Sequence, residues 1–222
     1  MKILSHLLMA FLLFSSCQNS SNKPDGAQTN EFEHGAIVAA HPLASDVGVQ
    51  ILKDGGNAID AAIAVQFALA VVYPNAGNIG GGGFMLYRSH DGNVDALDFR
   101  EKAPEKSDKD MYLDAEGNAI TDLSLYGQLA AGVPGTVAGM VAAHEKYGSM
   151  DWKALVAPAI KLAKEGFQIT GMQAAEFNKH QELFSKLNGD GAAIIRSEAW
   201  KEGDIFQQPE VASTLERVAN AG

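Results

Sequence analysis

The most constraining feature of this sequence is a run of four consecutive glycines, Gly80–Gly83, directly before two short apolar runs that flank Asp91-Gly92. An Asp-Gly pair between apolar runs is a strong hairpin signal, because the turn needs positive φ angles that glycine adopts without strain. We therefore predict antiparallel strands at residues 84–89 and 94–100. The glycines before them indicate close backbone packing or positive φ angles.

The glycine run does not match the patterns that bind nucleotides. It lacks a Gly-Lys-Ser/Thr ending, and no acidic residue follows at the dinucleotide spacing after a βαβ unit. Lysine and arginine total 17 against 27 acidic residues, the net charge is −10, and no basic stripe is clustered. We therefore expect neither a nucleotide nor a nucleic acid as a partner.

Arg100 ends the second predicted strand, where alternation puts it on the same face as Ala96 and Asp98. From the pattern alone it is either a solvated edge residue or a receptor for a carboxylate. His34 and His41 are separated by a predicted strand and turn, so we do not expect them to form a metal pair. The nearby acidic side chains, which we expect to be solvated, are Asp95, Asp98, Glu101 and Glu105.

The segment before the glycines predicts a strand followed by two helices. Residues 35–40 are a short apolar run, which indicates a buried strand, and Pro42 suits the first turn of a helix that two glycines end. Asn57 is a natural cap for a second helix at 58–72, which is apolar nearly all round. A helix buried on most sides implies layers above and below it.

The rest of the chain is predicted to be mostly helical. Residues 102–125 are rich in charged and turn residues and indicate a surface excursion. The hairpin supplies only a fraction of a sheet, so the pattern favours an α+β fold that this chain leaves incomplete. Four helices are predicted here: 134–147, a second capped by Asp151 and ended by Gly166, a peripheral one at 172–187, and a last one at 210–219.

The first residues predict export. Lys2 precedes an apolar run at 3–14 that is too short for an ordinary membrane span, and Cys17 follows two serines, as in a bacterial lipobox. We predict a signal peptide at 1–17 with lipid on Cys17, and a polar flexible tether at 18–33, with a plain signal peptide as the alternative. The expected location is the periplasm or cell envelope, with membrane attachment only through the lipid.

Five segments, in order, resemble the large-subunit part of the γ-glutamyltransferases, also called glutathione hydrolases. They read HPLASDVGVQILKDGGNAIDAA, YPNAGNIGGGGFMLY, DFREKAP, AGVPGTVAGMVAAHEKYG and APAIKLAKEGF. The resemblance covers the chain behind its leader, so we expect residues 34–222 to be a partial large-subunit domain.

The resemblance implies an N-terminal-nucleophile hydrolase with a layered αββα fold, which cuts itself into two subunits and needs no cofactor. It also implies that Arg100 holds the α-carboxylate of a γ-glutamyl donor such as glutathione. The family nucleophile is a threonine in a Thr-x-His segment, whose free amine serves as base. No threonine here precedes a histidine by two positions; the threonines are Thr29, Thr121, Thr136, Thr170 and Thr214.

We therefore expect no catalytic residue in this chain and no activity from it alone, and the missing small-subunit part is an expected partner. Two alternatives stay open at this point. One is a non-catalytic or decayed surface lipoprotein, and the other is a related acylase that acts on glutaryl or cephalosporin-type side chains. The donor pocket of the missing part would separate the acylase from the transferase.

Overall fold

The computed structural model describes residues 32–221, and a compact unit begins at Ala36. The predictions for the signal peptide, for Cys17 and for most of the tether lie outside the described residues. The helices are α2 (Pro42–Lys53), α3 (Ala58–Val72), α4 (Thr121–Leu125), α5 (Thr136–Tyr147), α6 (Trp152–Glu165), α7 (Gly171–Asn188) and α8 (Pro209–Ala221). The strands are β1 (Phe84–Arg88), β2 (Val94–Asp98), β3 (Phe167–Gln168) and β4 (Ile205–Phe206), and short 3-10 turns lie at Gln128–Ala130 and Gly189–Gly191.

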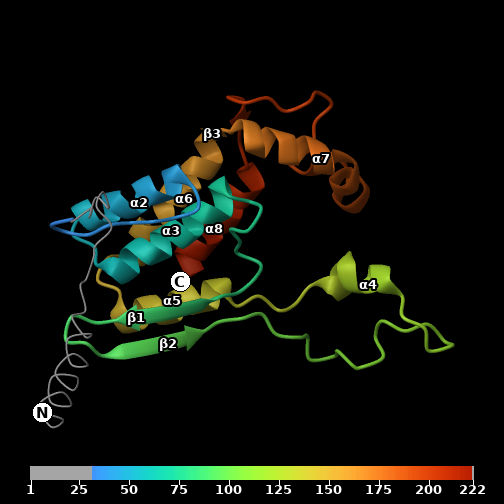
Figure 1. Ribbon diagram of the computed structural model, residues 1–222, viewed down its shortest axis with the longest axis horizontal. Helices are drawn as coiled ribbons and strands as arrows, with labels where there is room; N and C mark the ends of the chain where they lie inside the picture. The colour runs from blue at the N-terminus through green and yellow to red at the C-terminus, as the bar shows by residue number, and fades with distance from the viewer. Residues whose placement is uncertain (1–31, 222) are drawn as a thin grey trace, which may run out of the picture. The chain divides into compact units, whose positions relative to one another are not determined.

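The strands form two antiparallel pairs, β1 with β2 and β3 with β4. This confirms the predicted α+β class, with mostly helices and one hairpin. In Figure 1, α2, α3, α6 and α8 are packed together, and each contacts the next in that order. Among the described residues no helix combines the length and the apolar character that crossing a membrane requires.

Helices α2, α3, α6 and α8 form a helical layer, and α3 lies at its centre. Ile63, Phe67 and Val71 are at most 1% exposed, because α2 and α6 pack on it and α5 contacts it as well. The Asn57 side chain caps its first turn by accepting the N–H groups of Ile59 and Asp60, as the sequence predicts. The layer is therefore organised around a helix with no polar face.

Asp60 is fully buried at the start of α3 and joins this helix to the loop after α5. Its carboxylate accepts the N–H groups of Asn57 at 2.9 Å and of Ser149 at 3.0 Å, and the N–H of Met150 at 3.3 Å. Burial alone would raise the pKa of Asp60, but hydrogen bonds from Ser149, Asn57 and Met150 together lower it. The charged form is thus the one that the fold accommodates.

Helix α6 is capped by Asp151 and ends at Gly166, whose φ of 79° is easily adopted only by glycine. Pro158 lies inside α6 and does not divide it. Helix α7 is peripheral, as predicted. An aromatic cluster joins α7 to the β3–β4 pair. The members of this cluster are Phe167, Phe177, Trp200 and Phe206. The two strands of the pair have two residues each and were too short to predict.

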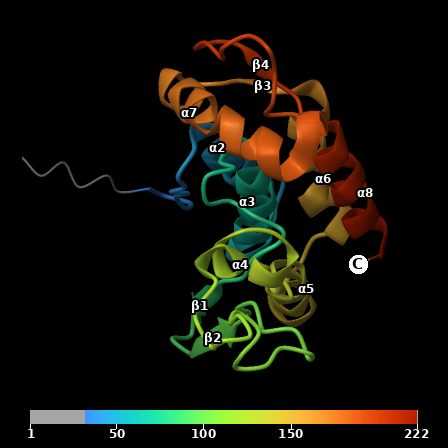
Figure 2. The same ribbon diagram turned by 90° about the vertical axis from the view of Figure 1, so that its right-hand side faces the viewer.

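The β1–β2 hairpin lies at the lower end of the unit beside α5 (Figure 2). Its strands end one and two residues earlier than predicted. Ser89 donates to the carbonyl of Asn93 at 2.9 Å, so the connection is a three-residue loop in which Gly92 alone takes a positive φ, 90°. Met85 and Leu97 face the core, whereas Phe84 is 67% and Leu86 82% exposed.

The predicted buried strand at residues 35–40 is wrong. Ile37 packs on the core, but Val38 is 95% exposed and the segment forms no strand. A strand needs a neighbour for its backbone hydrogen bonds, and none of the described strands pairs with this segment.

Residues 102–133 leave the helices as an exposed excursion, seen on the right of Figure 1. Lys102 and Val133 close it with two backbone hydrogen bonds of 3.1 and 2.8 Å. The predicted surface excursion at 102–125 is confirmed, and it contains only the short helix α4.

Candidate functional site

Arg100 lies just beyond the end of β2, on the outer side of the hairpin. Its side chain is 63% exposed, and its guanidinium lies 3.9 Å from the Glu101 carboxylate and 5.9 Å from the centre of the Phe84 ring. The Arg100 N–H donates to the Asp98 carboxylate at 3.0 Å. Within the described residues no group forms a hydrogen bond with the guanidinium itself, so its planar fork faces solvent.

Glycines on two sides fix the backbone at Arg100. A Cβ on Gly82 would lie 2.6 Å from the Arg100 Cα, and one on Gly135 would lie 2.0 Å from the Phe99 carbonyl oxygen. Neither glycine has a positive φ, so close approach is the reason for the absent side chains. The sequence indicated close packing for the first run but did not predict that Gly135, before α5, also serves Arg100.

A hollow of about 300 Å³ lies beside Arg100, between the end of β2 and α5. Its apolar lining includes Phe99 from the hairpin and Ala138 and Ala142 from α5, and its charged lining residues are Asp98, Arg100 and Lys102. Small residues on α5 leave this space open beside two cationic residues and one acidic residue. A concave site with two cationic residues can receive an anionic group of a small ligand.

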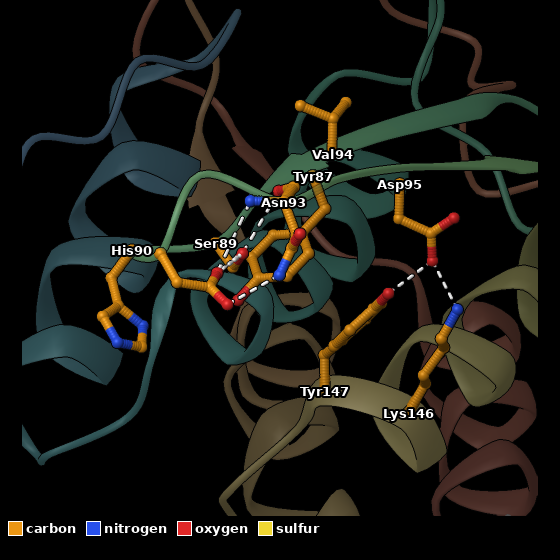
Figure 3. A pocket seen from close by; sticks show the side chains of 9 residues that line it. Tyr87, Ser89, His90, Asn93, Val94, Asp95, Lys146 and Tyr147 are labelled. Atoms are coloured by element: carbon orange, nitrogen blue, oxygen red, sulfur yellow. Dashed lines mark hydrogen bonds and ion pairs between the residues drawn. The ribbon is translucent and has the colours of Figure 1, made fainter.

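A larger hollow, of about 540 Å³, lies at the turn of the hairpin (Figure 3). Asp95 accepts hydrogen bonds there from the Lys146 ammonium and the Tyr147 hydroxyl, and these lower the pKa of Asp95 to about 2. The centroids of the Tyr87 and Tyr147 rings are 4.5 Å apart. These hydrogen bonds attach the hairpin to α5.

The acidic side chains near the hairpin do not form one cluster. Asp95 faces α5, whereas Asp98 lies on the opposite face of β2. His41 is buried at the start of α2, where its Nδ1 accepts the Leu43 N–H at 3.3 Å. Burial lowers the pKa of His41. In the part of the chain that the structure describes, no group of three His, Cys, Asp or Glu side chains could hold a metal ion.

Comparison with known proteins places this geometry in a family. The sequence model of the family described as Gamma-glutamyltranspeptidase matches residues 44–222. The glutathione hydrolase proenzyme of Escherichia coli K12 is 41% identical over 99% of this chain and 40% of its own length. The corresponding proenzyme of Pseudomonas aeruginosa is 48% identical over 85% of this chain and 33% of its own length.

Solved structures agree with the sequence comparison. The Helicobacter pylori γ-glutamyltranspeptidase matches with a TM-score of 0.82 at 47% identity, over 86% of this chain and 56% of that one. A cephalosporin acylase from Bacillus halodurans matches with a TM-score of 0.70 over 86% of this chain and 39% of that one, but at 24% identity it shows a shared fold alone.

The chain spans about two fifths or less of the length of these curated relatives. Within that span the likeness covers both the glycine run and Arg100, which lie inside the matched residues 44–222. The helical layer, the hairpin and the glycine-packed turn at Arg100 therefore belong to one known architecture: this chain is a member of the γ-glutamyltranspeptidase family.

Proposed function

We propose that this chain is the N-terminal part of a γ-glutamyltransferase, or glutathione hydrolase, in which Arg100 receives the α-carboxylate of the γ-glutamyl donor. One observation carries the proposal. This chain belongs to the family, and closely packed glycines fix the backbone at Arg100. The Arg100 guanidinium has no hydrogen-bonding partner among the described residues. A guanidinium fork matches a carboxylate with two parallel charge-assisted bonds.

The reaction is acyl transfer through a threonine. The threonine oxygen attacks the γ-carbonyl carbon, the amine of the donor leaves with a proton, and the γ-glutamyl ester that remains is cleaved by water or an amino acid. None of the threonines in these 222 residues lies in a Thr-x-His segment, so another segment supplies the nucleophile. Arg100 contributes binding and register, and no cofactor takes part.

The exposed apolar face of the hairpin supports the proposal that the remaining family sequence is a partner of this chain. Its outer face carries Phe84, Leu86 and Val94, which are 67%, 82% and 70% exposed. An antiparallel sheet with apolar side chains on both faces is suited to a position between two layers. We infer that the small-subunit part covers this face and completes the site around Arg100.

The test compares Arg100→Ala with Arg100→Lys in a protein that continues this chain with the rest of the family sequence. A charge-assisted hydrogen bond contributes roughly 1.5–3 kcal/mol, so Arg100→Ala should lower kcat/KM for glutathione by about one to two decades. Lysine keeps the charge but loses the planar fork, so Arg100→Lys should retain part of the binding.

Self-cleavage is the control, because it does not use the donor, and both variants should still process themselves. Near wild-type kcat/KM in both variants would show that Arg100 is only structural. Loss of self-cleavage in both variants would instead show that Arg100 is needed for folding.

The purified chain of 222 residues tests the assignment of the nucleophile. We expect no release of p-nitroaniline from a γ-glutamyl anilide above a heat-treated control, since positioning without a nucleophile gives little rate. Activity should emerge when the remaining part is co-expressed; continued inactivity would favour a non-catalytic lipoprotein. Preference for a glutaryl anilide, which lacks the α-ammonium group, would favour the acylase alternative.

We also propose that the protein is exported and that Cys17 carries lipid. The support is the order of Lys2, an apolar run and two serines before the cysteine. A single acyl chain binds membranes only marginally, so stable attachment needs the several chains of a bacterial lipoprotein. Cys17→Ser should move the protein to the soluble fraction after cell fractionation; unchanged membrane recovery would contradict this.

A further inference from the structure

Asn78 and Thr136 form a partly buried link between the glycine run and the start of α5. The Asn78 Oδ1 atom accepts two hydrogen bonds, from the Thr136 hydroxyl at 2.7 Å and from the Gly81 N–H at 2.9 Å. Thr136 is fully buried, and the two side chains are 58 positions apart in sequence. The link is therefore made only by the tertiary structure.

Backbone bonds run parallel to this side-chain bond. The Gly81 carbonyl accepts the N–H groups of Gly135 at 2.7 Å and of Thr136 at 3.1 Å. These donors belong to the first turn of α5, where N–H groups have no partner within the helix. The Gly81 carbonyl thus acts as a capping group, and the glycine run is attached to the N-terminal end of α5.

The backbone at Arg100 lies between the glycine run and the residue before α5. The Phe99 N–H donates to the Gly83 carbonyl at 3.0 Å, so the chain that leads to Arg100 is bound to the glycine run. On the other side, a Cβ on Gly135 would lie 3.0 Å from the Arg100 carbonyl oxygen. The separation between the glycine run and α5 therefore sets the position of the Arg100 backbone.

We propose that Thr136 is a positioning residue for donor binding, acting through Asn78 and the glycine run on Arg100. The inference rests on the proposed role of Arg100 and adds to it what sets the position of the Arg100 backbone. Thr136 is fully buried in this chain. Its hydroxyl is the only side-chain donor that Asn78 Oδ1 accepts within the described residues.

The experiment compares Thr136→Val with Thr136→Ser in the protein continued to the full family length. Valine has the shape of threonine but removes the hydroxyl, and serine keeps it. A net hydrogen bond corresponds to about a two- to tenfold effect, so Thr136→Val should raise KM for the γ-glutamyl donor by that factor. We expect kcat to stay within about twofold, because the lost interaction is uniform binding. Thr136→Ser should restore the wild-type KM.

A double-mutant cycle separates positioning from general stability. If Thr136 acts through Arg100, Thr136→Val should change KM no further once Arg100→Ala is present. Additive effects on KM, or equal KM values for the valine and serine variants, would overturn the inference. If Thr136→Val folds poorly, Asn78→Ala removes the same bond, together with the one from the Gly81 N–H, and should raise KM by at least that factor; no increase would overturn the inference.

The two proposals fail differently. If Arg100→Ala leaves KM unchanged, the proposed donor site is wrong, and the proposed role of Thr136 is then wrong as well. If Arg100→Ala raises KM but Thr136→Val does not, the donor site stands and only the positioning role is lost.

Discussion

The helical layer and the β1–β2 hairpin differ in how completely this chain buries their apolar side chains. Phe67, Leu155 and Leu215, in α3, α6 and α8, are 0% exposed. On the hairpin, Leu86 is 82% and Val94 70% exposed, although the opposite face packs against the core. The apolar side chains of the layer are thus buried within the chain, whereas one face of the hairpin stays exposed.

The difference follows from the geometry of the two kinds of element. Several helices can surround α3, so an apolar helix finds partners on every side within one segment of sequence. A strand alternates its side chains between two faces, and α5 contacts the hairpin only at one of them. The incomplete region is also the one that carries Arg100.

The largest expected effect comes from making the same substitution in both regions. Leu155→Ala removes a fully buried side chain from α6 and should lower the free energy of unfolding by about 2–5 kcal/mol. Leu86→Ala on the hairpin should change it by no more than about 0.5 kcal/mol in this chain. Urea unfolding followed by circular dichroism measures both.

Similar losses for the two leucine variants would show that the outer face of the hairpin is covered in this chain. In the protein continued to full length we expect Leu86→Ala to become destabilising, because the added part should cover the leucine. Absence of any such change would remove the argument for a covering layer.

A smaller effect is expected within the glycine run, which joins the two regions. In Gly82→Ala the new methyl group would lie 2.6 Å from backbone atoms of Arg100 and Glu101, so the hairpin end must shift, at a cost of about 1–3 kcal/mol. Gly80→Ala has open space and should stabilise by up to about 1 kcal/mol through the unfolded state. Thermal unfolding checks the pair; equal effects would contradict the close-approach interpretation.

The smallest expected effect concerns the attachment of the hairpin to α5 by Asp95. The Lys146 ammonium and the Tyr147 hydroxyl lower the pKa of Asp95 from 3.8 to about 2 in the folded chain. Because the folded pKa lies below the unfolded one, the stabilisation is fully present above the unfolded value and is lost as the pH falls towards about 2. The Tm difference between wild type and Asp95→Asn should shrink over that range.

Salt provides the control for Asp95, since its side chain is 40% exposed and screening at 1 M salt acts over about 3 Å. Added salt should therefore also reduce the Tm difference between wild type and Asp95→Asn. A difference independent of pH and salt would mean that the carboxylate contributes through packing rather than charge.

Local patterns were sufficient wherever a signal lay within a few residues. Asn57 and Asp151 cap the helices that they were expected to cap, and Gly92 takes the positive φ that the hairpin needs. The apolar run at 35–40 failed because its strand depends on a neighbour that a run of residues does not specify. The β3–β4 pair was missed because two residues carry no periodicity.

The sequence by itself determined the long helices, the hairpin, the resemblance that singled out Arg100 and the face of the strand on which it lies. Only the tertiary structure decided what holds Arg100 in place. Gly82, Gly135 and the bond between Asn78 and Thr136 come from segments far apart in the chain, and they meet because α5 packs beside the hairpin. Short-range patterns specify local backbone conformation, whereas contacts between distant segments depend on how the elements pack.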